Sequence, residues 1–220
     1  MAHGLTYVTR RNHAATNRTN RTNRDPTMSR IPAIDPATAT GKQKTLLDAV
    51  QKKLGLVPNL MRTLANSPAA LDGYLALSGA LAAGVLDAKV REQLALTVAE
   101  ANLCDYCLSA HTAIGGMVGL SKDDIQSARL ATAANAKTNA ILKLARSIVV
   151  NRGEISATEL QTARSAGVTD AEIVETTVNV ALNILTNYTN HVAQTVVDFP
   201  PVAKASTAAA SCDTGTCHTH

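Results

Sequence analysis

The chain has 220 residues, with 21 Lys and Arg against 17 Asp and Glu, so its formal net charge is +4. The whole excess lies in residues 1–27, which hold five arginines and one acid, whereas the other 193 residues carry 16 bases and 16 acids. Because the rest of the chain has no surplus of positive charge, a folded nucleic-acid-binding domain is not expected.

Residues 1–28 form an Arg-, Asn- and Thr-rich arm that contains the repeat NRTNRTNR and shows no apolar periodicity. This composition predicts disorder. Three origins remain open: a translated upstream region before a true start at Met28, a genuine flexible arm, or an organelle transit peptide. The last is least favoured, since the arm has little amphipathic character.

Residues 29–202 are predicted to form one all-α domain of about eight or nine helices. Hydrophobic residues make up 45% of the chain and aromatic residues only 2%, and an apolar content of Ala, Leu, Val and Ile favours closely packed helices over sheets. Start and stop residues mark the helices. The expected ranges are 42–54, 58–65, 68–83, 87 to about 102, 105–118, 121 to about 132, about 137–152, a helix opened at Ser156, and a last helix from Thr169 to about Val197.

Residues 203–220 form a small, polar tail that is also predicted to be disordered. It contains a cluster of potential ligands, namely Cys212, Cys217, His218 and His220. The cluster could bind a soft metal or act as a second dithiol, but a tail with adventitious metal affinity is favoured because a fixed site needs supporting structure.

The chain lacks both a membrane-spanning run of roughly 20 apolar residues and an apolar signal-peptide core. We therefore expect no membrane partner and a cytoplasmic location, where paired cysteines indicate redox or metal chemistry rather than a structural disulfide.

The chemistry-bearing stretch contains Cys104 and Cys107 at the start of a predicted helix, followed by His111. Two cysteines one turn apart can form a disulfide, and a helix N-terminus lowers a thiol pKa. His111 lies four residues after Cys107 on the same helical face, where it can accept the thiol proton. Glu92 and Glu100, on the preceding helix, are both candidates to orient the imidazole, and spacing alone does not choose between them.

The combination of Glu92 with Cys104-Asp-Tyr-Cys107-Leu-Ser-Ala-His111 resembles the active-site signature of the alkylhydroperoxidase AhpD-like, or carboxymuconolactone decarboxylase-like, superfamily. The resemblance spans about residues 30–200 and includes VPNLMRTLANSPAALDGYLAL at 57–77. It implies that Glu92 is the acid of the relay, that Cys107 is the peroxide-reactive thiol, that Cys104 resolves its sulfenic acid to a disulfide, and that His111 and Glu92 relay protons. It also implies a homotrimer or homohexamer.

Tyr106 stands where well-studied peroxidases of this family have a second histidine between the cysteines. A phenol with an ordinary pKa near 10 can orient a group or donate a hydrogen bond, but it is a poor base at neutral pH. Relatives that decarboxylate a lactone lack the paired cysteines, so that activity is disfavoured. Tyr188 and His191 in the last helix could line the same pocket, although packing or a subunit interface is the favoured role.

The predicted function is therefore a thiol-dependent peroxidase that reduces hydrogen peroxide or organic hydroperoxides, uses a thiol or protein electron donor, and requires no cofactor. Two alternatives stay open. One is a disulfide reductase or adaptor that recycles a peroxiredoxin, and the other is a metal-binding or redox-sensing module. Zinc would need a fourth ligand beside Cys104, Cys107 and His111.

Overall fold

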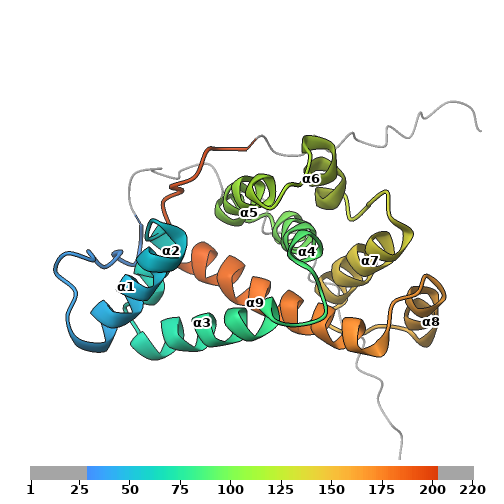
Figure 1. Cartoon of the computed structure of the whole chain (residues 1–220), viewed down its shortest axis with the longest axis horizontal. Helices are drawn as coiled ribbons and strands as arrows, with labels where there is room; N and C mark the ends of the chain where they lie inside the picture. The colour runs from blue at the N-terminus through green and yellow to red at the C-terminus, as the bar shows by residue number, and fades with distance from the viewer. Residues whose placement is uncertain (1–28, 203–220) are drawn as a thin grey trace, which may run out of the picture.

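The computed structural model describes residues 29–202, which contain nine α-helices and no strand (Figure 1). This confirms the prediction of an all-α fold with eight or nine helices. The helices are α1 Gly41–Leu54, α2 Asn59–Leu64, α3 Pro68–Ala82, α4 Ala88–Ala101, α5 Asp105–Met117, α6 Lys122–Arg129, α7 Ala136–Val150, α8 Ala157–Ser165 and α9 Asp170–Ala193. Within this part of the chain, no helix is long and apolar enough to cross a membrane.

Short polar motifs set most helix starts. Ser121, Ser156 and Thr169 each accept a hydrogen bond from the backbone N–H three residues on, and the acid at that position bonds back to the cap. These reciprocal bonds satisfy donors that the first helical turn leaves unpaired. α1 ends at Gly55, whose φ of 76° is the left-handed conformation that glycine adopts without strain.

Two predicted helix ends are wrong. α9 ends at Ala193 rather than near Val197, because Gln194 adopts the left-handed conformation with φ 49°. α6 ends at Arg129 rather than near Thr132, and Ala131 has φ 58°. Both stops use a non-glycine residue with positive φ, which the sequence does not signal.

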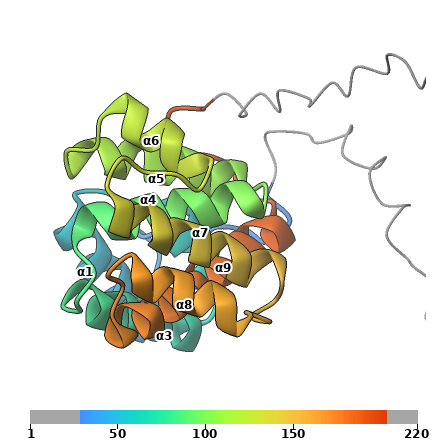
Figure 2. The same cartoon turned by 90° about the vertical axis from the view of Figure 1, so that its right-hand side faces the viewer.

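α4 occupies the centre of the fold. Every residue from 93 to 99 is buried, and the helix packs against α5, α6, α7 and α9. In Figure 1 the long α9 passes behind α4 and beside α3, with α1 and α2 towards one end of the molecule and α8 towards the other. The view turned by 90° places α5 and α6 on one side of α4, and α9, α8 and α3 on the other (Figure 2). A helix enclosed in this way has little freedom to shift, so its side chains are held in fixed directions.

A largely buried ion pair fastens the C-terminal end of α4 to α6. Arg129 Nε donates to Glu100 Oε2 over 2.8 Å, and the two side chains are 6% and 16% exposed. Glu92 and Glu100 were both candidates to orient the His111 imidazole, and the structure pairs Glu100 with Arg129 instead. Removing one partner of such a pair leaves a buried charge without its counterion.

We therefore expect Glu100→Gln to lower the free energy of unfolding by about 2–3 kcal/mol, measured by urea denaturation. Asp48→Asn provides the control, because Asp48 forms an exposed pair with Lys44 on α1 and such pairs contribute about 1 kcal/mol or less. Equal and small effects of both substitutions would contradict the assignment of Glu100 to a structural role.

Candidate active site

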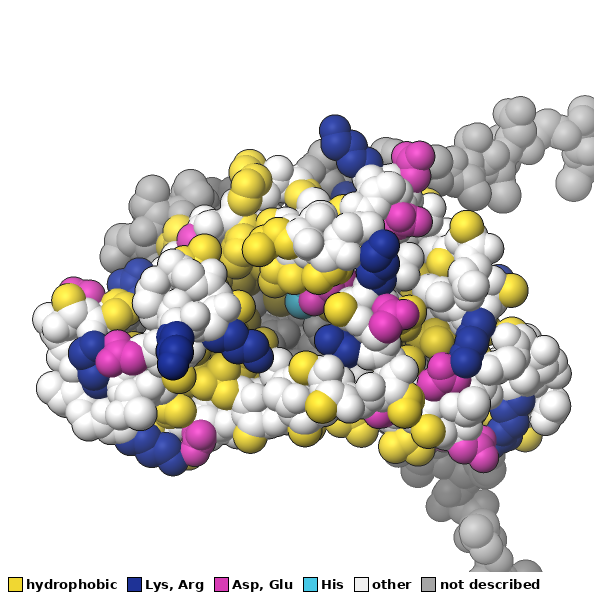
Figure 3. Space-filling view, viewed as in Figure 1, with side chains coloured by type: hydrophobic (Ala, Val, Ile, Leu, Met, Phe, Trp, Pro, Cys, Tyr) yellow, Lys and Arg dark blue, Asp and Glu magenta, His cyan; other side chains and the backbone are white. Residues whose placement is uncertain are grey.

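A cavity of about 470 Å³ lies between the N-terminal helices, α4, α5 and α9. Its lining is mostly apolar, but Glu92, Cys107 and His111 all contribute to it. A space-filling view shows a hollow with a histidine in its floor (Figure 3). Of the two cysteines at the start of α5, only Cys107 is among the lining residues, so a small molecule in the cavity meets that sulfur.

The two thiols occupy different positions in the first turn of α5. Cys104 is the N-cap residue and Cys107 lies three residues into the helix. Both are free and both are 2% exposed. The preceding residue, Leu103, has φ 56°, a left-handed conformation that turns the chain from α4 into α5. This sharp reversal brings α5 back along α4.

The cysteines differ in acidity because a hydrogen bond links them. The bond from Cys104 lowers the pKa of the Cys107 thiol most; burial opposes this shift, and the bond from the Asn190 amide of α9 supports it. The same bond, followed by burial, raises the pKa of Cys104. Of the two thiols, Cys107 is therefore the one that loses its proton more readily, and Cys104 keeps its proton to higher pH.

His111 is paired with Glu92. Its Nδ1 lies 2.7 Å from Glu92 Oε2, and the two side chains are 21% and 18% exposed. Burial alone would lower the pKa of His111, but the charge of Glu92 and its hydrogen bond outweigh burial and raise it. Of the two acids that the sequence offered, the structure brings Glu92 and not Glu100 to His111.

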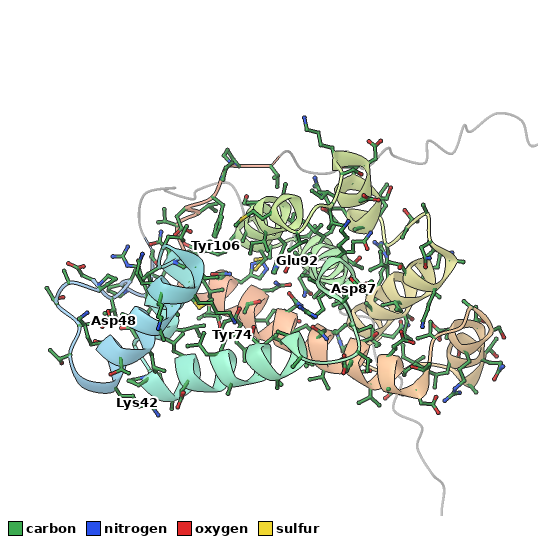
Figure 4. The ribbon with its side chains drawn as sticks, in the orientation of Figure 1. Lys42, Asp48, Tyr74, Asp87, Glu92 and Tyr106 are labelled. Atoms are coloured by element: carbon green, nitrogen blue, oxygen red, sulfur yellow. The ribbon has the colours of Figure 1, made fainter. Side chains whose placement is uncertain are left out.

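Two tyrosines line the cavity with these groups, Tyr74 from α3 and Tyr106 from α5, and both are labelled in Figure 4. The Tyr106 hydroxyl accepts a hydrogen bond from the Leu60 N–H over 3.0 Å, and its ring meets Phe199 edge to face at 5.8 Å. Burial raises the pKa of Tyr106, and burial together with Glu92 raises that of Tyr74 to about 12. Both are neutral phenols at neutral pH and therefore poor bases there, and the Tyr106 hydroxyl already bonds to Asp198.

The structure places Tyr188 and His191 outside this cavity. At 100° per residue, the α9 face that carries Asn183 and Thr186 points to the cavity, and Tyr188 points away from it. Tyr188 is 55% exposed, and His191 Nε2 lies 3.1 Å from the Asn102 carbonyl oxygen. The favoured packing or interface role for both remains a prediction.

Sequence reasoning missed the polar face of α9. The Asn190 side-chain amide donates to Cys107 Sγ over 3.2 Å, and Asn187 accepts from the Asn102 amide over 2.9 Å. The available signal was the spacing of four residues between Asn179, Asn183 and Asn187, which places amides along one face of a helix that must be buried. Buried amides in such a row indicate a polar site and not a plain core.

Metal binding finds no support in residues 29–202, where no group of three or more His, Cys, Asp or Glu side chains is placed to hold an ion. The cluster of Cys212, Cys217, His218 and His220 lies outside the described residues, as does the arm at 1–28.

Comparisons with known proteins agree with this architecture. Residues 68–150 match the model of the carboxymuconolactone decarboxylase family. An uncharacterized protein of Haemophilus influenzae is 53% identical over 45 residues, which are 20% of this chain and 40% of that protein. The chain thus spans less than half the length of this curated relative.

Solved structures share the fold at low identity. A peroxidase-related protein from Silicibacter sp. TM1040 aligns with a TM-score of 0.68 and 22% identity, over 83% of this chain and 95% of its own. An AhpD-core, peroxidase-related protein from Ralstonia eutropha JMP134 aligns with a TM-score of 0.68 and 24% identity, over 80% of this chain and 93% of its own. The apo debrominase Bmp8 aligns with a TM-score of 0.65 and 15% identity, over 75% of this chain and 90% of its own. Proteins of this fold therefore differ in the reactions that their names indicate, and the function of this chain has to be inferred from its site residues.

Asn190→Ala tests the polar face of α9. Loss of the amide donor removes a bond that lowers the pKa of Cys107, so less thiolate is present at neutral pH. We expect alkylation of Cys107 by iodoacetamide at pH 7, followed by mass spectrometry, to slow about three- to tenfold. Thr189→Ala, on the outer face of α9, should leave the rate unchanged. An equal rate in both variants would show that Asn190 does not stabilise the thiolate.

Glu92→Gln tests the imidazole pair. Without the carboxylate charge, burial remains as the largest influence, so the pKa of His111 should fall from above 6.5 to below it. Proton NMR of the histidine rings across pH measures this shift, and a His111→Gln spectrum assigns the resonance. The exposed Glu154→Gln variant is the control. A pKa for His111 that stays above 6.5 in Glu92→Gln would contradict the pairing.

Proposed function

We propose that the chain is a member of the AhpD-like, or carboxymuconolactone decarboxylase-like, superfamily and that it is a thiol-dependent peroxidase of hydrogen peroxide or organic hydroperoxides. The observation that carries this proposal is the acidic Cys107 thiol, which faces the cavity while Cys104 donates a hydrogen bond to it from outside the lining. Peroxide reduction needs such a pair: a thiolate that the substrate can reach and a second thiol that can close a disulfide.

In the first step, the Cys107 thiolate attacks the terminal oxygen of ROOH. The sulfur–oxygen bond forms and the oxygen–oxygen bond breaks, so Cys107 becomes a sulfenic acid and RO⁻ leaves. The alkoxide takes a proton from the His111 imidazolium and departs as ROH. The elevated pKa of His111 supports this role, because it keeps the ring protonated at higher pH than an ordinary histidine.

In the second step, the neutral His111 accepts the proton of Cys104, directly or through water. The Cys104 thiolate attacks the Cys107 sulfenic sulfur, which forms the disulfide, and the hydroxide that leaves takes the proton back and departs as water. An external dithiol or two small thiols then supply two electrons and two protons and restore the pair. Peroxide is reduced to an alcohol and water, and the donor thiols are oxidised.

We extend the proposal to the state of the protein in the cell: a cytoplasmic homotrimer or homohexamer that needs no cofactor and takes electrons from a thiol or protein donor. Apolar side chains on the outer face of α9 support self-association. Tyr188 and Val192 are 55% and 64% exposed there, an arrangement typical of a surface that another subunit covers.

Rapid mixing of the reduced protein with excess hydroperoxide tests the chemistry. We expect two thiols per chain to disappear from the described cysteine pair, none of this fast loss in Cys107→Ser, and a sulfenic acid that dimedone traps in Cys104→Ser. Slow reaction with every peroxide but rapid exchange with a protein disulfide would overturn the peroxidase and favour the adaptor. Stoichiometric zinc on the reduced protein would favour the metal-binding module.

A further inference from the structure

Two cations line the cavity in addition to the catalytic groups: Lys53 from the last turn of α1 and Arg91 from α4. Within residues 29–202, neither forms an ion pair. Glu92 is the only acid of the lining, and His111 already pairs with it. In Figure 3, Lys and Arg side chains lie on either side of the hollow that shows the histidine. The cavity therefore offers positive charge that no carboxylate of the described residues neutralises.

The loop between α3 and α4 fixes the position of Arg91. Its Nη1 donates to the Leu86 carbonyl, and the Val85 and Leu86 N–H groups donate to the Glu175 carboxylate of α9 over 2.8–3.1 Å. A Cβ at Gly84 would crowd that carboxylate, so a larger residue there would displace Glu175 from these N–H groups. With one N–H engaged, the guanidinium keeps further donors in a rigid fork, the geometry that binds a carboxylate through two bonds.

The cavity is also too large and too apolar for hydrogen peroxide alone. A water molecule occupies about 30 Å³ in the liquid, a small part of the 470 Å³ here. The walls facing Cys107 include Met61, Leu75, Leu81 and Ile114. Binding a hydrocarbon body against such walls is favourable because it removes apolar surface from water. A few polar groups then fix the orientation of the ligand.

We propose that the cavity binds an organic hydroperoxide with an apolar body and a carboxylate, which Arg91 and Lys53 hold while the peroxide group reaches Cys107. This inference rests on the proposed peroxidase function and names its substrate class. The carboxylate takes no part in the reaction: Cys107 becomes a sulfenic acid, the oxygen–oxygen bond breaks, and the product is the corresponding hydroxy acid.

A long-chain unsaturated fatty-acid hydroperoxide and its methyl ester form the matched pair of probes, used below the micelle concentration of the acid. We compare the rate constants for Cys107 oxidation and report the ratio of acid to ester for each protein. The wild type should prefer the acid. Arg91→Gln should lower the ratio about tenfold, because a guanidinium can bind a carboxylate through two hydrogen bonds. Lys53→Gln should lower it about threefold, because an ion pair with an exposed lysine is weaker. Lys52→Gln removes a neighbouring charge outside the cavity and should leave the ratio unchanged.

Calorimetry with the corresponding hydroxy acid and its methyl ester separates this inference from the peroxidase chemistry. If the hydroxy acid binds more tightly than its ester and Arg91→Gln removes the difference, the carboxylate site stands even when no hydroperoxide oxidises the thiols. If acid and ester bind and react equally in the wild type, or if Lys52→Gln changes the ratio as much as Lys53→Gln, the carboxylate site is overturned even when peroxidase activity is present.

Discussion

The enclosure of α4 is the constraint on which the rest of the structure depends. Its buried residues 93–99 pack against four helices, so the two acids near its ends cannot exchange roles. Glu100 is held by Arg129 of α6, and Glu92 is held by His111 of α5. The left-handed Leu103 folds α5 back along α4, which is why residues 19 apart in sequence meet over 2.7 Å. A looser α4 would weaken the domain and the imidazole pair together.

A second constraint is the burial of the acidic Cys107 thiol. Moving a thiolate out of water costs free energy, which the surrounding donors must offset. Cys104 and the Asn190 amide of α9 supply such donors, so this position of α9 has an electrostatic role that a leucine could not fill. The same donors make the pair asymmetric, because the pKa of Cys107 is lowered while that of Cys104 is raised. In the proposed cycle, this difference in pKa explains why Cys107 attacks the peroxide and Cys104 attacks only in the second step.

Sequence analysis predicted the all-α fold, because capping boxes and helix-ending glycines are local signals that folding does not alter. It also placed Cys104, Cys107, His111 and Glu92 in one motif through spacing and family resemblance. It failed where tertiary contacts decide. The left-handed Gln194 ends α9, and no local pattern predicts the contact of Asn190 with Cys107 or the place of Lys53 and Arg91 in the cavity lining. The sequence also allowed Tyr188 to line the cavity, but its position around the axis of α9 directs it to the outside.

The division of the cavity among helices suggests how one fold accommodates different substrates. The segment that matches the family model, 68–150, contains Glu92, the cysteine pair and His111. Lys53, the α2 wall and the whole of α9 lie outside it. Substitutions in these outer elements can change the size, polarity and charge of the cavity without moving the thiols on α5, because α4 holds α5 independently. A chain of this fold can therefore change its cavity through the outer helices while it keeps the cysteine pair, and Lys53, to which our proposal assigns carboxylate binding, lies on such a helix.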